Sequence, residues 1–245
     1  MDVEHLIALL KTYYAGFSFD VTAHTHVFAP WSILIFFASF DFRFNNYWFP
    51  SGSQPTPLMD YLLERKRQDP LDFLQPIKVA QNALLSSQPD HNLDINTLQH
   101  QTGYLTIRAV DTDGRLVPGF PNREVESSMA NLYRQLMTND AEDEPLHSHT
   151  SLLTLLNQGD AAPVVEYLNT VFNRLNVTRF PVRDEATFIG ALQILLIGLE
   201  LHPQIEIHTA HGRNDIEGQT PDYHWIFELK WVEHQIVRCL FHKRS

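Results

Sequence analysis

The chain has 245 residues, of which 44% are hydrophobic and 19% charged, and its formal net charge is −11. This composition is ordinary for a folded globular protein and excludes the disordered and fibrous classes. The single cysteine, Cys239, excludes an internal disulfide and favours a reducing compartment. No signal peptide is visible, and the longest apolar runs, Trp31–Phe40 and Phe188–Leu199, are shorter than the roughly 18 residues that a membrane span needs. We therefore expect a cytoplasmic protein that does not bind membranes.

Residues 1–68 are predicted to be a helical segment rich in aromatic side chains. Apolar residues at helical spacing predict helices over Val3–Tyr14, Trp31–Phe40 and Pro57–Lys66. Pro30 suits the first turn of the second helix, where its missing N–H has no cost. The segment contains a polar, proline-dotted stretch, residues 50–57, that we expect to be a loop.

Residues 69–123 are predicted to form a small winged-helix-like unit. Leu71–Ser86 has helical spacing, and Gly103–Val110 alternates between apolar and polar residues as a strand does. A turn at Asp111–Gly114 leads to a second strand over Arg115–Phe120. Because no basic recognition helix is present, a packing role is favoured over DNA binding, although winged helices serve both roles.

From Glu124 onward the pattern predicts helices followed by a sheet, which makes the whole chain α+β. Glu185–Leu201 is apolar nearly all round and ends before Pro203, so it is predicted to be a buried helix. Three strands follow, at Gln204–His208, Arg213–Glu217 and Tyr223–Trp231. Two amphipathic helices precede them, and their apolar faces comprise Val125, Met129, Leu132, Tyr133, Leu136 and Met137 in the first, and Val164, Val165, Leu168, Val171, Phe172 and Leu175 in the second.

The last predicted strand places chemically useful side chains on one face. Successive side chains alternate between faces, so Glu228 and Lys230 lie side by side, opposite a core face with Trp225 and Phe227. A turn at Gly218–Asp222 folds the preceding strand back as a hairpin. Asp215 is then expected to lie beside Glu228.

Two carboxylates and an ammonium group at one spot suit metal-assisted hydrolysis of a phosphodiester. Mg²⁺ or Mn²⁺ prefers oxygen ligands, which Asp215 and Glu228 supply, and Lys230 is expected to orient the attacking water or stabilise the developing charge. Glu185, at the start of the buried helix, is a candidate additional catalytic residue. By spacing alone, the alternative is a surface ion-pair cluster on a half-exposed strand, because the pattern D…E-x-K is short and common.

Longer segments add a family resemblance. Gly212-Arg-Asn-Asp-Ile and Thr220-Pro-Asp-Tyr-His-Trp-Ile-Phe-Glu-Leu-Lys230 resemble the nuclease segment of a bacterial family that joins an AAA-ATPase-like domain to a PD-(D/E)XK nuclease superfamily domain. Five upstream segments resemble the family in the same order, and they are Tyr13–Phe19, Ala29–Leu34, Asn46–Gly52, Gln101–Ile107 and Gly119–Val125.

The resemblance implies an organisation and a set of roles. Residues 1–68 correspond to part of the ATPase-like domain, 69–123 to the winged-helix-like unit, and 124–245 to a PD-(D/E)XK nuclease-like α/β core with a mixed sheet. Asp215, Glu228 and Lys230 match the catalytic pattern, Glu185 an assisting glutamate, and Arg213 an arginine beside the metal, which implies a substrate contact.

Three departures from the family leave a second hypothesis open. The chain has no phosphate-loop motif, so no ATP hydrolysis of that kind is expected. Ile189 stands where the family often has histidine, and only residues 232–245 follow the core motif.

The first hypothesis is a nuclease acting on nucleic acid, DNA before RNA. The second is an inactive interaction module with the same fold, which would homodimerise through exposed edges or the apolar amino-terminal segment. The acidic net charge, the absent ATPase core and the short segment after the core motif favour this second hypothesis.

Overall fold

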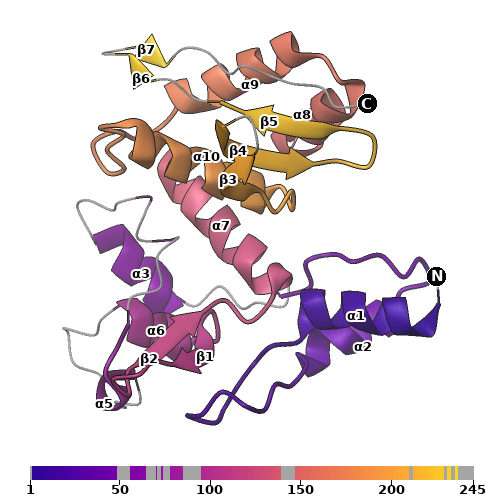
Figure 1. Cartoon of the computed structure of the whole chain (residues 1–245), viewed down its shortest axis with the longest axis vertical. Helices are drawn as coiled ribbons and strands as arrows, with labels where there is room; N and C mark the ends of the chain where they lie inside the picture. Colours follow the sequence, from indigo (N-terminus) through magenta and orange to yellow (C-terminus); the bar gives the residue numbers. More distant parts are fainter. Residues whose placement is uncertain are drawn as a thin grey trace. The chain divides into compact units, whose positions relative to one another are not determined.

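A computed structural model of the chain describes residues 2–48, 56–64, 70, 73, 78–84, 95–138, 147–209, 212–228, 231–232 and 235–236 (Figure 1). The chain divides into two compact units. Unit 1 comprises Met1–Arg65 and Gln75–Met129, and unit 2 comprises Lys66–Leu74 and Ala130–Ser245. Both units combine helices with antiparallel strands, which confirms the α+β class.

Unit 1 begins with two helices around an aromatic core. Helix α1 spans Val3–Tyr14 and α2 spans Pro30–Ala38, with the proline in its first turn, so both predictions are confirmed. The side chains of Tyr14 and Phe36 are fully buried, and their ring centroids lie 6.0 Å apart. The Tyr14 hydroxyl donates to the Asn45 carbonyl oxygen at 3.0 Å, which satisfies its polar end inside the core.

Among its described residues, the rest of unit 1 comprises three short helices and a hairpin. Helices α3 (Thr56–Glu64), α5 (Gln81–Leu84) and α6 (Ile95–Gln101) precede strands β1 (Thr106–Val110) and β2 (Leu116–Gly119), which pair antiparallel. The two strands confirm the predicted hairpin.

The helix predicted over Leu71–Ser86 is confirmed over Gln81–Leu84, which is α5, and is wrong around Val79. The helix expected over residues 71–86 is interrupted at Val79, which forms a β-bridge to Leu116 in β2. Val79, Leu84, Ile107 and Leu116 form a buried cluster. A β-branched residue that pairs with a distant strand gains more from this cluster than from local helical spacing.

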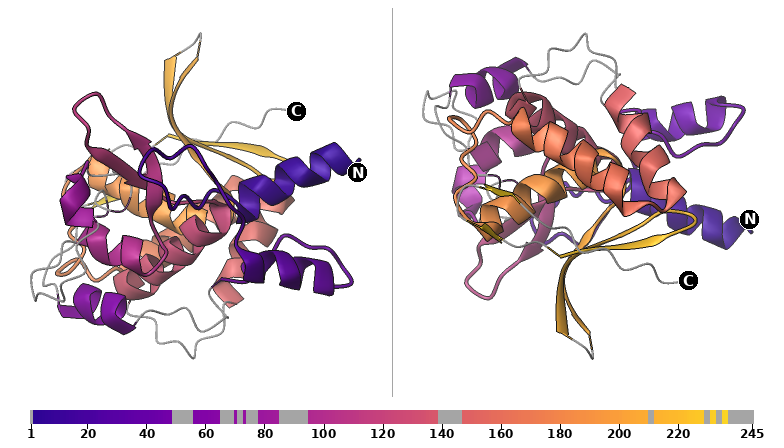
Figure 2. Two further views of the ribbon diagram at one scale, coloured as in Figure 1. Left: turned by 90° about the horizontal axis from the view of Figure 1, so that it is seen from below. Right: turned by 90° about the horizontal axis from the view of Figure 1, so that it is seen from above.

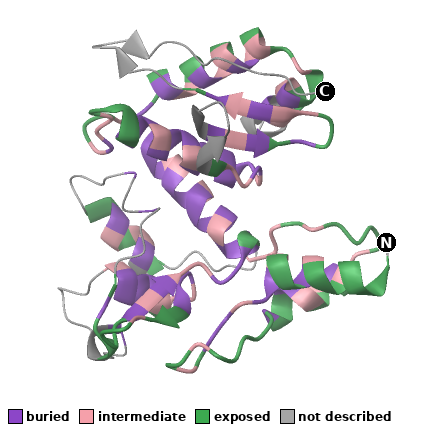
Figure 3. Ribbon diagram, viewed as in Figure 1, coloured by how far each residue is buried: buried purple, intermediate pink, exposed green. Residues whose placement is uncertain are grey.

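Helix α7 (Arg123–Thr138) begins in unit 1 and continues into unit 2. Its predicted apolar face, from Val125 to Met137, is buried (Figure 3). In unit 2, α8 (His147–Gln158) packs against α9 (Ala161–Asn173), and α10 (Glu185–Gly198) packs against the sheet. Helix α10 is buried along most of its length, as its uniformly apolar sequence predicts.

The sheet of unit 2 is a three-stranded meander in the order β3–β4–β5. Its strands are Gln204–Thr209, Gly212–Gln219 and His224–Phe227. Both pairings are antiparallel because short turns join consecutive strands, so the mixed sheet expected from the resemblance is not seen among the described strands. Two further views show the β3–β4 hairpin extending away from the helices of unit 2 (Figure 2).

Two short strands follow the meander. Trp231–Val232 forms β6, which pairs with β7 at Gln235–Ile236. The single strand predicted over residues 223–231 is therefore divided, with Trp231 in a separate two-stranded sheet. Across the part of the chain that the structure describes, no helix has the length and apolar character to cross a membrane.

Candidate functional site

The β4–β5 hairpin brings together the two chain segments that carry the predicted metal ligands, and its last strand pair, Ile216 with Phe227, directly adjoins Asp215 and Glu228. Ile216 pairs with Phe227, and Gly218 pairs with Trp225. Continuing this antiparallel register by one residue would place Asp215 across from Glu228. The hairpin expected from the sequence is therefore present.

One face of this hairpin is anchored in the core of unit 2. Ile216, Trp225 and Phe227 are buried, and the rings of Trp225 and Phe227 lie 6.3 Å apart between centroids. The indole N–H of Trp225 donates to the Leu156 carbonyl oxygen in α8 at 3.1 Å. This face fixes the register, since a slip of one residue would bring the polar face into the core.

The opposite face of the hairpin is open to solvent. His224 and Ile226 are half-buried, and Glu228 is exposed. This alternation is the one predicted for the strand, and it leaves the carboxylate of Glu228 accessible to a ligand.

The turn that joins β4 and β5 is held by two residues. The Thr220 N–H donates to the Tyr223 carbonyl oxygen at 2.9 Å, and the Tyr223 N–H donates to the Thr220 hydroxyl at 3.2 Å. Gly159, which follows α8 with φ +71, lies against the Tyr223 ring, where an added Cβ would be 2.6 Å from ring carbons. The turn is thus braced on the end of α8.

Sequence reasoning missed one polar pair on the solvent face. His224 and Glu217 form a contact of 2.9 Å between Nε2 and Oε2. Glu217 lies two residues after Asp215 in β4, and His224 lies four residues before Glu228 in β5. Their even spacing from the predicted ligands was the available signal. The pair adds a third carboxylate and an imidazole to the hairpin face that Glu228 occupies.

Glu185 is the first residue of α10 and is exposed. Asp184 caps the helix, and its side chain accepts from the Thr187 N–H at 2.9 Å. Hydrogen bonds from the Thr187 backbone and side chain lower the pKa of Asp184. Helix α10 packs against β4, so Glu185 belongs to an element that adjoins the strand of Asp215.

The remaining predicted site residues are described in part or not at all. Arg213 and Asp215 have described backbone positions in β4, where Arg213 pairs with His208, but their side chains lie outside the described set. Lys230 lies outside the described residues altogether. Within the described set, no group of three or more His, Cys, Asp or Glu side chains is arranged to hold a metal ion.

In unit 1, a buried carboxylate joins three of the segments that carry the resemblance. Glu124, 2% exposed, accepts from the Ser32 hydroxyl at 2.7 Å and from the backbone N–H groups of Tyr47 at 2.8 Å and Trp48 at 3.0 Å. Asn122 adds a fourth segment, because its side-chain amide donates to the Ala15 carbonyl oxygen at 2.9 Å. These segments are therefore parts of one hydrogen-bonded framework.

Comparison with known proteins adds one relative. No family model and no solved structure matches the chain. A protein of Azotobacter chroococcum mcd 1, described as an uncharacterized protein in the vnfD 5′ region, is 30% identical over 238 residues. The aligned region covers 91% of this chain and 43% of that protein, so the chain spans less than half the length of this relative.

Proposed function

We propose that the chain is a metal-dependent nuclease of the PD-(D/E)XK kind that hydrolyses phosphodiester bonds in nucleic acid. The observation that carries the proposal is the β4–β5 hairpin, whose last strand pair directly adjoins Asp215 and Glu228 and whose other face is buried. The order of elements, one buried helix followed by an antiparallel meander, supports it further.

The donor set on this hairpin suits a hard divalent cation. Asp215 and Glu228 bring carboxylate oxygens, which Mg²⁺ and Mn²⁺ prefer, and these two residues would hold the ion. When bound, the ion supplies a polarised water and offsets negative charge on the phosphate. Glu217 and His224 occupy the same hairpin and engage each other, so the hydrogen bond between them positions both beside the ligands.

Three further residues have proposed roles in the reaction. Lys230 orients the attacking water or stabilises the developing charge, and Arg213 contacts a substrate phosphate. Glu185, exposed in the first turn of α10, assists as an additional acid or base. Nucleic acid, DNA before RNA, is the proposed partner.

Metal binding is the first test. Isothermal titration of Mg²⁺ and of Mn²⁺ is compared between the unsubstituted protein, Asp215→Ala and Asp222→Asn. Asp222 is exposed in the β4–β5 turn and serves as the matched control carboxylate. We expect binding that is lost in Asp215→Ala and kept in Asp222→Asn. Equal binding by both variants would place the metal elsewhere and refute the assignment.

Cleavage is the second test. Labelled single- and double-stranded DNA and RNA are incubated with Mn²⁺ and with Glu228→Gln, Lys230→Met and unsubstituted protein. Loss of a group that stabilises transition-state charge lowers the rate by roughly 10²–10³-fold. A folded, metal-binding protein that cuts none of the four substrates would exclude the nuclease.

Unit 1 contains the element order of a winged helix, and we propose that architecture for the predicted unit, residues 69–123, of which residues 75–123 lie in unit 1. Helices α5 and α6 precede the β1–β2 hairpin, and the Val79 bridge to Leu116 supplies the third strand position. Buried Asn96, Thr97, Leu98 and Gln99 leave little of α6 to read a groove, so this element is proposed to pack rather than to bind DNA.

A second candidate function is an inactive interaction module that forms a homodimer. Exposed apolar side chains in unit 1 favour it, including Phe40 at 103% and Leu34 at 65% exposure. Sedimentation equilibrium of the unsubstituted protein and of Leu34→Glu tests this candidate. A dimer that dissociates in Leu34→Glu, together with absence of metal binding, would favour the module over the enzyme.

A further inference from the structure

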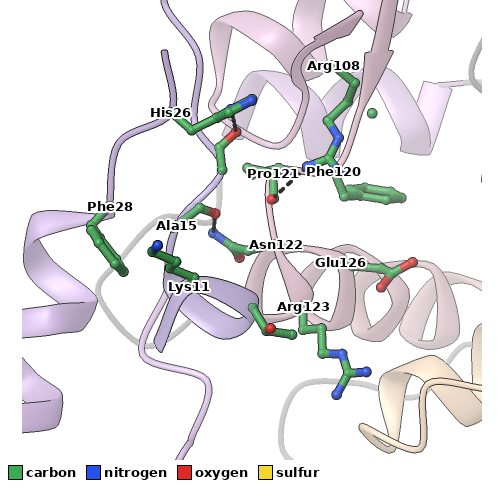
Figure 4. Close-up of a pocket in the computed structure, with 13 residues that line it drawn as sticks. Lys11, Ala15, His26, Phe28, Arg108, Phe120, Pro121, Asn122, Arg123 and Glu126 are labelled. Carbon is green, nitrogen blue, oxygen red and sulfur yellow. Dashed lines mark hydrogen bonds between the residues drawn. The ribbon is translucent and has the colours of Figure 1, made fainter. Parts of the chain in front are cut away.

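A cavity of about 850 Å³ is lined by residues of unit 1, none of which belongs to the proposed nuclease site (Figure 4). The end of α1, the Gly16 turn, the end of β2 and the first turn of α7 border it, and it is open to solvent. Its lining combines three cations with aromatic side chains, namely Lys11, Arg108, Arg123, Phe28 and Phe120.

Within the part of the chain that the structure describes, the three cations have no carboxylate partner. Among the described residues, none of Lys11, Arg108 and Arg123 forms an ion pair. Arg108 donates one Nη1 hydrogen bond to the Pro121 carbonyl oxygen at 3.1 Å, and Arg123 lies 5.8 Å from the centroid of the Tyr13 ring. A guanidinium has five N–H donors, so most of the Arg108 fork remains available to a ligand.

This concentration of positive charge contrasts with the chain as a whole, whose net charge is −11. Glu126 is the single carboxylate in the lining, and the three cations leave the cavity positive. Helix α7 begins at the cavity, so the partial positive charge of its amino-terminal end adds to the charge of the lining.

The cavity wall is rigidly built. Asn122 is buried, donates to the Ala15 carbonyl oxygen at 2.9 Å and accepts from the Val125 N–H at 3.0 Å (Figure 4). Gly16 has φ +100, and a Cβ there would lie 2.0 Å from the Pro121 carbonyl oxygen. Only glycine therefore allows the close approach that forms the wall beside Arg108.

We propose that this cavity binds the phosphate group of a phosphorylated organic molecule. Arg108 presents a planar fork that matches phosphate oxygens, and Lys11 supplies a second charge from α1. The aromatic rings of Phe28 and Phe120 lie in the same lining and suit the organic part of the ligand. The site uses none of the residues proposed for metal binding and extends beyond the nuclease proposal.

The test is isothermal titration in EDTA, so that its result does not depend on the metal site. The probes are inorganic phosphate, ribose 5-phosphate, and short oligothymidylates with a 5′-phosphate or a 5′-hydroxyl. Lys11→Met keeps the side-chain stem and removes the charge, and Arg108→Lys keeps the charge and removes the fork. Arg115→Gln, an exposed arginine in the β1–β2 turn, is the control.

We expect phosphorylated probes to bind, with affinity lowered roughly tenfold or more in Lys11→Met and in Arg108→Lys and unchanged in Arg115→Gln. Preference for ribose 5-phosphate identifies a small-molecule source, and preference for the 5′-phosphorylated strand identifies a chain end. Binding of inorganic phosphate but of none of the phosphorylated organic probes would overturn the role of Phe28 and Phe120. Absence of binding to the folded protein, or equal binding by Lys11→Met, would overturn the site.

Discussion

Glu124→Ala is predicted to destabilise unit 1 because it removes an acceptor shared by three donors. The carboxylate is 2% exposed and accepts from the Ser32 hydroxyl and from the N–H groups of Tyr47 and Trp48. Each donor left unpaired in the interior costs about 1–3 kcal/mol. Glu124 therefore has far more effect on the free energy of unfolding than a surface glutamate has.

The magnitude follows from the burial of each donor. Ser32 is fully buried, so the loss of its acceptor costs about 2 kcal/mol. Tyr47 and Trp48 are half-buried and partly reach water, so the loss of the acceptor costs about 1 kcal/mol for each N–H group. The total of about 4 kcal/mol is a large share of the roughly 5–15 kcal/mol by which domains are stable. Glu124→Gln keeps an acceptor oxygen for both N–H groups and is expected to lose only about 1–2 kcal/mol.

Urea unfolding followed by circular dichroism and by tryptophan fluorescence measures the change. Because the chain has two compact units, both signals are needed to assign the transition to unit 1. Glu166→Ala, on the exposed side of α9, is the control and should stay within about 0.5 kcal/mol. A loss below about 1 kcal/mol in Glu124→Ala, or equal losses in the Ala and Gln variants, would show that the Glu124 carboxylate does not stabilise unit 1 through these donors.

Three further predictions concern backbone strain and titration. Gly159→Ala should cost about 2 kcal/mol in urea unfolding, because φ is +71 and the Cβ would meet Tyr223; an unchanged midpoint would contradict this. Burial raises the pKa of Tyr104 to about 12 in the folded protein. The unfolded chain therefore loses this proton at a lower pH, and the free energy of unfolding falls as the pH rises from the unfolded pKa to the folded pKa. Alkaline unfolding of Tyr104→Phe should therefore show a weaker pH dependence, by up to about 3 kcal/mol, and an identical profile would exclude this role. Burial also raises the pKa of Glu200, so Glu200→Gln should raise the thermal midpoint at neutral pH but not near pH 4, and a gain at both would point to another cause.

Local periodicity was sufficient to predict much of this fold. Helix α1 matches its predicted range, and the apolar stripe of α7 is buried as its spacing indicates. The alternation in β5 correctly assigned Trp225 and Phe227 to the core, and the turn residues correctly predicted the hairpin between β4 and β5. These features depend on residues that are near one another in the chain.

Features that depend on distant residues could not be predicted in this way. Val79 is held in a β-bridge by Leu116, and no local pattern reports that partner. Helix α8 was missed because its first turn, His147-Ser-His-Thr-Ser, is polar and poor in helix formers, although Leu152 and Leu156 carry the spacing of a buried face. The acceptor role of Glu124 likewise arises only when three separate segments meet.

The interrupted course of unit 2 along the chain has a consequence for biosynthesis. Residues 66–74 belong to unit 2, yet they leave the ribosome before residues 75–129 of unit 1. The ring of Phe73 lies 5.2 Å from that of Tyr133, a partner made on the order of several seconds later at usual translation rates. The synthesis of unit 1 is thus complete before the ring of Phe73 has its partner Tyr133. Nascent chains stalled in that interval should be the ones most in need of chaperones.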